Sequence, residues 1–433
     1  MDVRQPLPND LPTVELRPRM PGGFRAGAVA AGIKASGGLD LGVLATVDGR
    51  PVPVAATFTT NLVRAAPVYL SQASLSSSVP EGESHWGRTA AVLSTSGCAN
   101  AATGGDGERD QEFLAEALGA ALAVATEQTL AISTGLIGTR LPVDRLRGRL
   151  RQLASDGLAA TDDALAALAE QMCTTDTHPK AASVTLDLRA TDGSRRPVIV
   201  SGIAKGVGMI HPRMATMLAL VLTDATVEPW LLYEMLLPAA EQTWNQLTGD
   251  GDTSTNDTVF LLASGAAGAA PVVAGSEEHR QLSRAVMAVA RALARQQAAD
   301  GEGATTLISC GVSGAESDVE ARAIARSVVG SSLVKAAVHG RDPNWGRIVA
   351  AAGNALVSGT PVKLNEAYLS VAIASVEVFD GAPLQFDKPA LARSMDAPEL
   401  LIRVHLGLGD GVGEAFGCDL TEQYVVENSA YST

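Results

Sequence analysis

The segment Gly202–Ala225, GIAKGVGMIHPRMATMLALVLTDA, contains residues whose types and spacing could carry out chemistry. Lys205 lies in a glycine-rich stretch, and Thr216 begins an apolar run eleven residues later. A threonine hydroxyl is a weak nucleophile until a base takes its proton. The six histidines are scattered, and no Ser/His/Asp arrangement supplies that base. The pattern by itself also allows a turn followed by a buried helix, with the Thr216 hydroxyl bonded to a backbone carbonyl.

Further segments along the chain also carry distinctive signatures, each with its own sequence. In chain order they are FTTNLVRAAPV, STGLIGTRLP, TTDTHPK, KGVGMIHPRMATML itself, TGDGDTSTNDTVFLLASG, DGEGATTLI, HGRDPNWGRI and CDLTEQYVVENSAYST. Together they resemble the ornithine acetyltransferase family, the bifunctional glutamate N-acetyltransferases. Members of that family cleave themselves between the Ala and Thr of the MAT triplet. The resemblance therefore implies a break between Ala215 and Thr216, giving chains 1–215 and 216–433.

The implied break would give Thr216 a base of its own. As the first residue of a chain, Thr216 carries an α-amine with an ordinary pKa of ~7.7–8.0, and this amine can take the Oγ proton directly or through one water. Cleavage can use the same hydroxyl: Thr216 Oγ attacks the Ala215 carbonyl, an N-to-O shift gives an ester, and water hydrolyses it.

The resemblance also implies a ping-pong reaction on Thr216. The acetyl group of N2-acetyl-ornithine passes to Thr216, ornithine leaves, and glutamate takes up the acetyl group. No metal and no organic cofactor is implied, and acetyl-CoA stays open as a second donor substrate.

Both half-reactions pass through tetrahedral oxyanions. For these the resemblance implies two donors in STGLIG, the Thr134 hydroxyl and the Gly135 backbone N–H. One such donor contributes ~2.7–4 kcal/mol to the transition state. Taken by itself, STG also suits a plain turn or a helix cap.

Two charged residues match the family's contacts to the ends of the substrate. The resemblance assigns Lys205 to a substrate carboxylate, and Glu302 of DGEG to the side-chain ammonium of ornithine. The residues alone leave two alternatives open, a solvated loop lysine for Lys205 and a turn acid at a helix end for Glu302.

The remaining substrate contacts follow from the same resemblance. In the TTDT run, Thr174 is the first choice, with Thr175 and Thr177 as close competitors. Asn428 and the terminal Thr433 match the family's closing contacts. This predicts an ordered chain end, against the usual behaviour of termini.

The sequence departs from the family pattern at a few positions. Cys98 and Ala102 stand where Asn and Cys are common, Arg213 where Asn is often found, and Thr306 where Lys is common. These differences leave open a specialised paralogue from a biosynthetic cluster. The residues are also compatible with an aminopeptidase-like amidohydrolase of the same fold, with water as acceptor, or with a binding or scaffold protein that does not cleave itself.

Composition and charge exclude several classes of partner. The 433 residues carry a formal net charge of -14. This negative charge argues against nucleic acid and anionic membrane surfaces as the main binding partners. It is uneven, with 20 Lys and Arg against 21 Asp and Glu in residues 1–215, and 13 against 26 in residues 216–433. The four cysteines form no CxxC or Cys/His cluster, which argues against a zinc site. With neither a signal peptide nor a spanning segment visible, we expect a cytoplasmic protein.

Strands and helices must position these residues. The sequence predicts both kinds of element, without a regular βαβ alternation. We expect an irregular arm over the first 25 residues, then strands in 27–70, 90–97, 182–189, 196–203, 361–381 and 401–411. Amphipathic spacing predicts helices from 110, at 142–155, 161–173, after 229, and at 276–299 and 316–337. This mixture favours an α+β fold.

The resemblance specifies the architecture further. It implies a layered α/β sandwich of the aminopeptidase-like type with a smaller C-terminal α+β domain. We expect the main domain to span residues 1–280 and the second domain residues 281–433. The resemblance also implies a heterotetramer of two chains of each kind.

Overall fold

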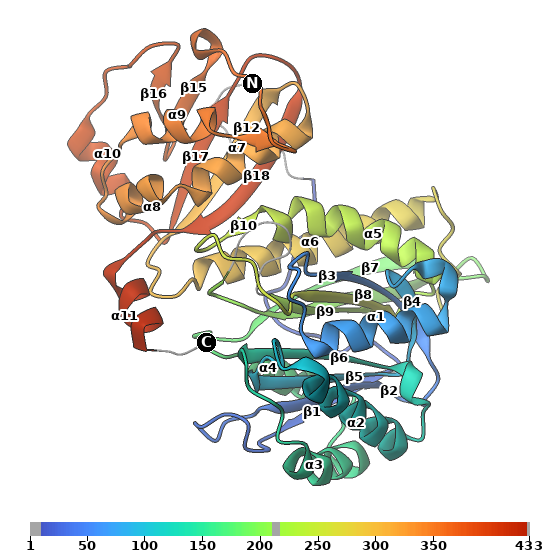
Figure 1. Ribbon diagram of the computed structural model, residues 1–433. Helices are drawn as coiled ribbons and strands as arrows, with labels where there is room; N and C mark the ends of the chain where they lie inside the picture. The colour runs from blue at the N-terminus through green and yellow to red at the C-terminus, as the bar shows by residue number, and fades with distance from the viewer. Residues whose placement is uncertain (1–9, 210–216, 431–433) are drawn as a thin grey trace.

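The computed structural model describes residues 10–209 and 217–430. Two stacked β-sheets with helices outside them form the larger part of the molecule, and a third sheet with its own helices forms a smaller part (Figure 1). The mixed sheets and helices confirm the expected α+β fold. Among the described residues, no helix combines the length and apolar character needed to cross a membrane.

The first sheet of the sandwich has four strands. Their order across the sheet is β1 (Phe24–Val29), β2 (Leu41–Thr46), β5 (Ala91–Cys98) and β6 (Thr129–Leu136). β5 and β6 run parallel, and the other neighbours are antiparallel. Thr134 and Gly135 therefore lie at the end of β6, beside β5.

The second sheet has six strands. Their order is β4 (Trp86–Thr89), β3 (Val52–Phe58), β11 (Thr258–Ala263), β9 (Leu218–Thr223), β8 (Arg195–Lys205) and β7 (Lys180–Arg189). β9 and β11 run parallel, and the other neighbours are antiparallel. Lys205, the last residue of β8, pairs with Leu218, the first residue of β9.

The apolar run after Thr216 forms a central strand rather than a helix. Leu218, Leu220 and Leu222 contribute to the core between the two sheets. Ala219 and Val221 contribute to the core under the outer helices. Successive side chains of a strand point to opposite faces, so a strand buried on both sides reads as a continuous apolar run. The alternative of a buried helix after Thr216 is therefore wrong.

Helices cover both outer faces of the sandwich (Figure 1). α5 (Pro229–Gln242) and α6 (Glu277–Ala299) pack on the second sheet. α2 (Gly104–Leu122) and α3 (Val143–Asp156) pack on the first sheet. α1 (Ala66–Ser78) and α4 (Asp162–Met172) add side chains to the core between the sheets. These layers agree with the expected sandwich.

The smaller part is built on a third sheet. Its strand order is β10 (Leu247–Thr248), β18 (Gly411–Cys418), β12 (Leu307–Ala315), β17 (Glu399–His405), β15 (Ser370–Ile373) and β16 (Val376–Asp380). Its helices are α7 (Asp318–Gly330), α8 (Ser332–His339), α9 (Trp345–Gly353) and α10 (Lys388–Ser394), with a small hairpin of β13 (Leu356–Val357) and β14 (Thr360–Pro361).

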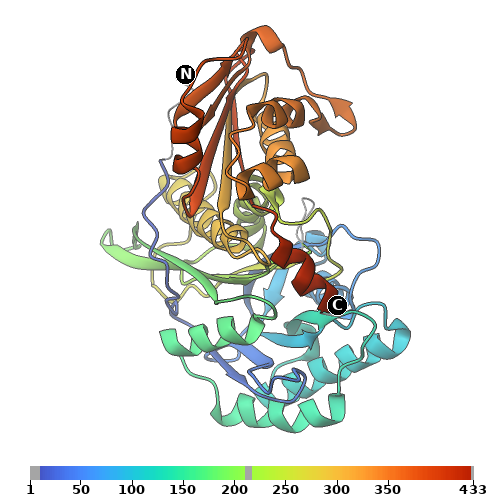
Figure 2. The same ribbon diagram turned by 90° about the vertical axis from the view of Figure 1, so that its left-hand side faces the viewer.

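The two parts have separate cores. The core of the smaller part runs from Ile308 to Ala415. The expected boundary at residues 280 and 281 lies within α6, whose apolar side chains belong to the sandwich core. The last helix, α11 (Glu422–Ala430), runs from the smaller part back toward the sandwich (Figure 2).

Two local predictions were wrong for identifiable reasons. Residues 64–70, RAAPVYL, lie in the 27–70 region where strands were expected, but α1 begins within them at Ala66 and Pro67 occupies its first turn. Proline is tolerated there because that N–H has no intrahelical partner. The helix expected over 316–337 is two helices, because the Ser331 hydroxyl accepts the Val334 N–H and caps the start of α8.

Candidate active site

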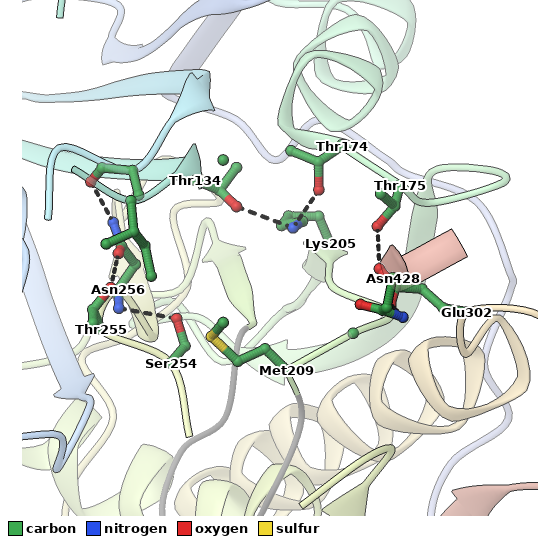
Figure 3. Close-up of a pocket in the computed structure, with 14 residues that line it drawn as sticks. Thr134, Thr174, Thr175, Lys205, Met209, Ser254, Thr255, Asn256, Glu302 and Asn428 are labelled. Carbon is green, nitrogen blue, oxygen red and sulfur yellow. Dashed lines mark hydrogen bonds between the residues drawn. The ribbon is translucent and has the colours of Figure 1, made fainter. Parts of the chain in front are cut away.

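A pocket lies where β6 and β8 end and where the turn after α6 meets α11 (Figure 3). Six of the predicted site residues line it: Thr134, Gly135, Thr174, Lys205, Glu302 and Asn428. Three others, Ala215, Thr216 and Thr433, lie outside the described residues. Met217, which follows Thr216 in the chain, is buried just before the β9 residue that pairs with Lys205.

Lys205 is a buried cation at the end of β8. The residue is 3% exposed, so the alternative of a solvated loop lysine is wrong. Its Nζ donates to Thr134 Oγ1 at 3.1 Å and to Thr174 Oγ1 at 2.9 Å. Figure 3 shows Lys205 between these two threonines. Because both hydroxyls accept from Lys205, each keeps its own proton for another acceptor in the pocket.

Thr134 and Gly135 form the end of a strand, so the turn and helix-cap alternatives for STG are wrong. Gly135 has φ +123°, a value that side-chain-bearing residues rarely adopt. A Cβ at this position would lie 2.3 Å from the carbonyl carbon of Gly97. Glycine is therefore required for β6 to lie this close to β5.

Asn256 is a pocket residue whose role the sequence did not reveal. Its buried Nδ2 donates to the carbonyl oxygens of Ala99 (2.7 Å) and Ser133 (2.9 Å) and to Ser133 Oγ (2.9 Å). The amide thus joins the loop before β11 to the ends of β5 and β6, next to Thr134. The only signal for it was its place in the signature TGDGDTSTNDTVFLLASG.

Glu302 supplies the opposite charge in the pocket. It follows α6 in a turn, and its carboxylate faces the pocket. Oε1 accepts from Thr175 Oγ1 at 2.8 Å, and Oε2 accepts from Asn428 Nδ2 at 2.8 Å. A carboxylate can accept about four hydrogen bonds, so it retains capacity for a substrate ammonium. A Cβ on Gly208 would meet Glu302 Oε2 at 2.4 Å, so a side chain at this position would force the Glu302 carboxylate to move.

The three threonines left open by the sequence have different partners. Thr174 contacts Lys205, Thr175 contacts Glu302, and Thr177 donates through its N–H to Asp300 Oδ2 at 3.0 Å. Thr174 and Thr175 line the pocket. Thr174 and Thr175 therefore lie where a substrate could reach them, Thr174 beside the lysine and Thr175 beside the glutamate.

A buried ionic cluster lies behind the pocket. Lys180 Nζ donates to Asp176 Oδ1 at 2.6 Å and to Asp300 Oδ2. The Asp176 and Lys180 side chains are fully buried. Burial by itself raises the pKa of Asp176, but the Lys205 and Lys180 ammonium groups and the Gly206 N–H outweigh it and lower the pKa to about 2. Both residues belong to the TTDTHPK signature, in which the sequence assigned them no role.

Asp257 is a second buried carboxyl that the sequence did not single out. It accepts the N–H of Met217 at Oδ1, 2.8 Å away. Its Oδ2 has no hydrogen-bond partner among the described residues. Burial raises its pKa well above the usual range. A buried carboxyl therefore contacts the peptide N–H that follows Thr216.

The pocket thus combines a cation, an anion and several hydroxyl and amide groups. Lys205 and Glu302 suit a molecule that carries both a carboxylate and an ammonium group. Within 10–209 and 217–430, no group of three His, Cys, Asp or Glu side chains is arranged to hold a metal ion.

Comparisons with known proteins show the family to which the chain belongs. Residues 25–433 match the ArgJ family. The chain is 41% identical over 415 residues to the arginine biosynthesis bifunctional protein ArgJ of Thermus thermophilus, covering 96% of this chain and 99% of that protein. It is 43% identical to the protein of the same name from Synechococcus sp., covering 95% and 96%.

A solved structure is also similar. The arginine biosynthesis bifunctional protein ArgJ of Bacillus halodurans is 38% identical, covers 48% of this chain and 96% of its own, and has a TM-score of 0.46. Because the family match and the two relatives extend over nearly the whole sequence, the chain belongs to the ArgJ family.

Proposed function

We propose that this protein transfers an acetyl group from N2-acetyl-ornithine to glutamate in arginine biosynthesis, using Thr216 after self-cleavage between Ala215 and Thr216. The observation that carries the proposal is the pocket lined by Thr134, Lys205 and Glu302. The family adds support, because the curated relatives are named arginine biosynthesis bifunctional protein ArgJ.

The first half-reaction acetylates Thr216. Its Oγ attacks the acetyl carbonyl carbon of the donor while the α-amine of Thr216 takes the hydroxyl proton. The Thr134 hydroxyl and the Gly135 N–H stabilise the oxyanion. The hydrogen bond from Lys205 Nζ to Thr134 Oγ1 supports this role, because Thr134 accepts in it and keeps its own hydroxyl proton to donate to the oxyanion. When the adduct collapses, the α-amine returns the proton to the ornithine nitrogen, which leaves.

The second half-reaction restores the free threonine. The amine of glutamate attacks the acetyl ester, the carbon–Oγ bond breaks, and the surplus proton of the amine reaches Thr216 Oγ through the α-amine. Lys205 binds the carboxylate of either amino acid, and Glu302 binds the side-chain ammonium of ornithine. This pair of charges favours amino-acid exchange over hydrolysis by water.

The self-cleavage that creates the α-amine uses the same hydroxyl. Thr216 Oγ attacks the Ala215 carbonyl, the peptide C–N bond breaks as the amine takes up the proton, and water hydrolyses the ester. The hydrogen bond from the Met217 N–H to Asp257 Oδ1 supports Thr216 as the attacking residue, because it fixes the peptide group that follows Thr216. No metal or organic cofactor enters these steps.

One assay tests the proposal. Purified protein is incubated with glutamate and either N2-acetyl-ornithine or acetyl-CoA, and N-acetyl-glutamate is measured. Product formed from N2-acetyl-ornithine supports the transferase, and product from acetyl-CoA adds a second donor. Release of acetate with no N-acetyl-glutamate would instead support an amidohydrolase.

The proposal extends to assembly and location. As the family resemblance implies, two 1–215 chains and two 216–433 chains form a cytoplasmic heterotetramer. Sedimentation combined with a denaturing gel tests the assembly: we expect a particle of about twice 44.4 kDa that separates into two fragments. Fluorescence of a tagged copy in cells tests the location.

A further inference from the structure

The segment Thr174–Thr177 connects the two charged ends of the pocket. Thr174 accepts from Lys205, and Asp176 accepts the Gly206 N–H at 2.9 Å. The alternate residues face the other way: Thr175 donates to Glu302, and Thr177 donates to Asp300. Each successive residue thus bonds alternately to the end of β8 and to the turn after α6.

The segment is held in place by buried charges. Lys205, Asp176, Lys180 and Asp300 alternate in sign, with Lys205 Nζ 3.9 Å from Asp176 Oδ2 and Lys180 Nζ bonded to both carboxylates. The Lys180 side chain is fully buried, and that of Asp300 is 4% exposed. Charges withdrawn from water interact strongly, and separating one from its partner is costly. The cluster therefore resists a change in the spacing of its members.

This cluster fixes one charged end of the pocket relative to the other. Asp176 is anchored beside Lys205, whereas Asp300 is two residues before Glu302 and shares its turn. Lys180 joins the two carboxylates. The cluster also crosses the predicted break, because Lys180 and Lys205 precede residue 216 and Asp300 and Glu302 follow it.

We propose that the Thr174–Thr177 segment and the Asp176–Lys180–Asp300 cluster set the separation of Lys205 from Glu302 and thereby select the side-chain length of the acetyl donor. This inference rests on the proposed function, in which Lys205 and Glu302 bind the two ends of that donor. Asp176, Lys180 and Asp300 are positioning residues, since they act through Lys205 and Glu302. Replacing them should change how strongly the protein discriminates between acetyl donors of different side-chain length.

The test compares donors that differ by one methylene. The fully processed protein is assayed with glutamate and N2-acetyl-ornithine, N2-acetyl-lysine or N2-acetyl-2,4-diaminobutyrate, and kcat/KM is measured for each. One methylene changes the preference for a substrate by roughly 10–200-fold in a fitted pocket. We expect the native protein to prefer N2-acetyl-ornithine by at least about 10-fold over both others.

The decisive variant is Lys180→Met combined with Asp300→Asn. It removes one positive and one negative charge together, so no buried charge loses all its partners, and Asp176 remains beside Lys205. We expect the preference for N2-acetyl-ornithine to fall to within about threefold, as the spacing is no longer fixed. Thr226→Val is the matched control: it removes a hydroxyl bonded to Ala269 away from the pocket and should keep the native preference.

The outcomes separate the two proposals. A folded double variant with the native preference would overturn the length selection and leave the transferase standing, as would a native protein that uses all three donors equally. A native protein that transfers acetyl from none of them overturns the proposed function itself. If the double variant does not fold, Thr177→Val removes only the hydroxyl that bonds to Asp300, and the same comparison of donors decides.

Discussion

Lys205 Nζ donates a hydrogen bond to Thr134 Oγ1 across 3.1 Å, joining the end of β8 to the end of β6. The two residues are 71 positions apart in the chain. The bond links the group proposed to bind a carboxylate with the hydroxyl proposed to stabilise the oxyanion. The proposed carboxylate-binding group and the proposed oxyanion donor are therefore in direct contact.

Removing the Thr134 hydroxyl should lower turnover while leaving substrate affinity nearly intact. In Thr134→Val the shape is kept but the oxyanion loses a donor, so we expect kcat for acetyl transfer to fall roughly 10²–10³-fold. Thr134→Ser keeps the hydroxyl and serves as the matched control. Steady-state kinetics with N2-acetyl-ornithine measures both variants, and a kcat of Thr134→Val equal to that of the native protein would contradict the oxyanion role.

The Thr216 hydroxyl should be required for both cleavage and transfer. Thr216→Ala is expected to give one uncut band near 44.4 kDa on a denaturing gel and no acetyl transfer. Thr216→Ser retains a hydroxyl and an amine, so it should still cleave and transfer, more slowly. Normal cleavage of Thr216→Ala would rule out the mechanism, and an inert Thr216→Ser would show that hydroxyl and amine do not suffice.

Gly208→Ala should mimic the loss of Glu302. The new Cβ would meet Glu302 Oε2 at 2.4 Å and displace the carboxylate from the pocket. Because charge-assisted hydrogen bonds contribute about 1.5–3 kcal/mol, we expect kcat/KM for N2-acetyl-ornithine to fall roughly 10–100-fold.

The double variant Gly208→Ala with Glu302→Ala provides the critical comparison. It should be no worse than either single variant, since both changes remove the same contact. Gly148→Ala is the control, because a Cβ at that position meets nothing within 4 Å. Additive losses in the double variant would show that Gly208 acts independently of Glu302.

The stabilising effect of Asp176 should depend on pH. Its pKa of about 2 lies below the ordinary 3.8, so the ionised carboxylate stabilises the fold above about pH 4. This contribution is lost as the pH falls from about 4 toward 2. At about pH 6 we expect Asp176→Asn to reduce the free energy of unfolding by roughly 3–5 kcal/mol, because two buried ammonium groups lose a partner.

Urea unfolding at about pH 6 and about pH 3 measures that effect. The difference between the native protein and Asp176→Asn should shrink at the lower pH, because the Asp176 carboxyl takes up a proton there in the unfolded chain while it stays mostly ionised in the folded protein. A difference that stays constant between the two pH values would mean that Asp176 is not ionised in the folded protein.

The sequence predicted the elements whose pattern is local. Amphipathic spacing located the helices observed as α3, α4 and α6, because the 3.6-residue period is visible within one segment. It did not identify β9 as a strand, since a continuous apolar run fits a buried strand and a buried helix equally well. Only the second sheet, which buries both faces of β9, decides between them.

The same distinction holds for the site. The sequence by itself determined the chemical groups and, through the family signatures, the residues to examine. In the structure, four of these residues line one pocket: Thr134, Lys205, Glu302 and Asn428. The tertiary structure decided which group meets which. Asn428 reaches Glu302 across 126 positions, and Asn256 reaches Ser133 across 123. Such contacts depend on how sheets and helices pack, which leaves no periodic trace in the residues that make them.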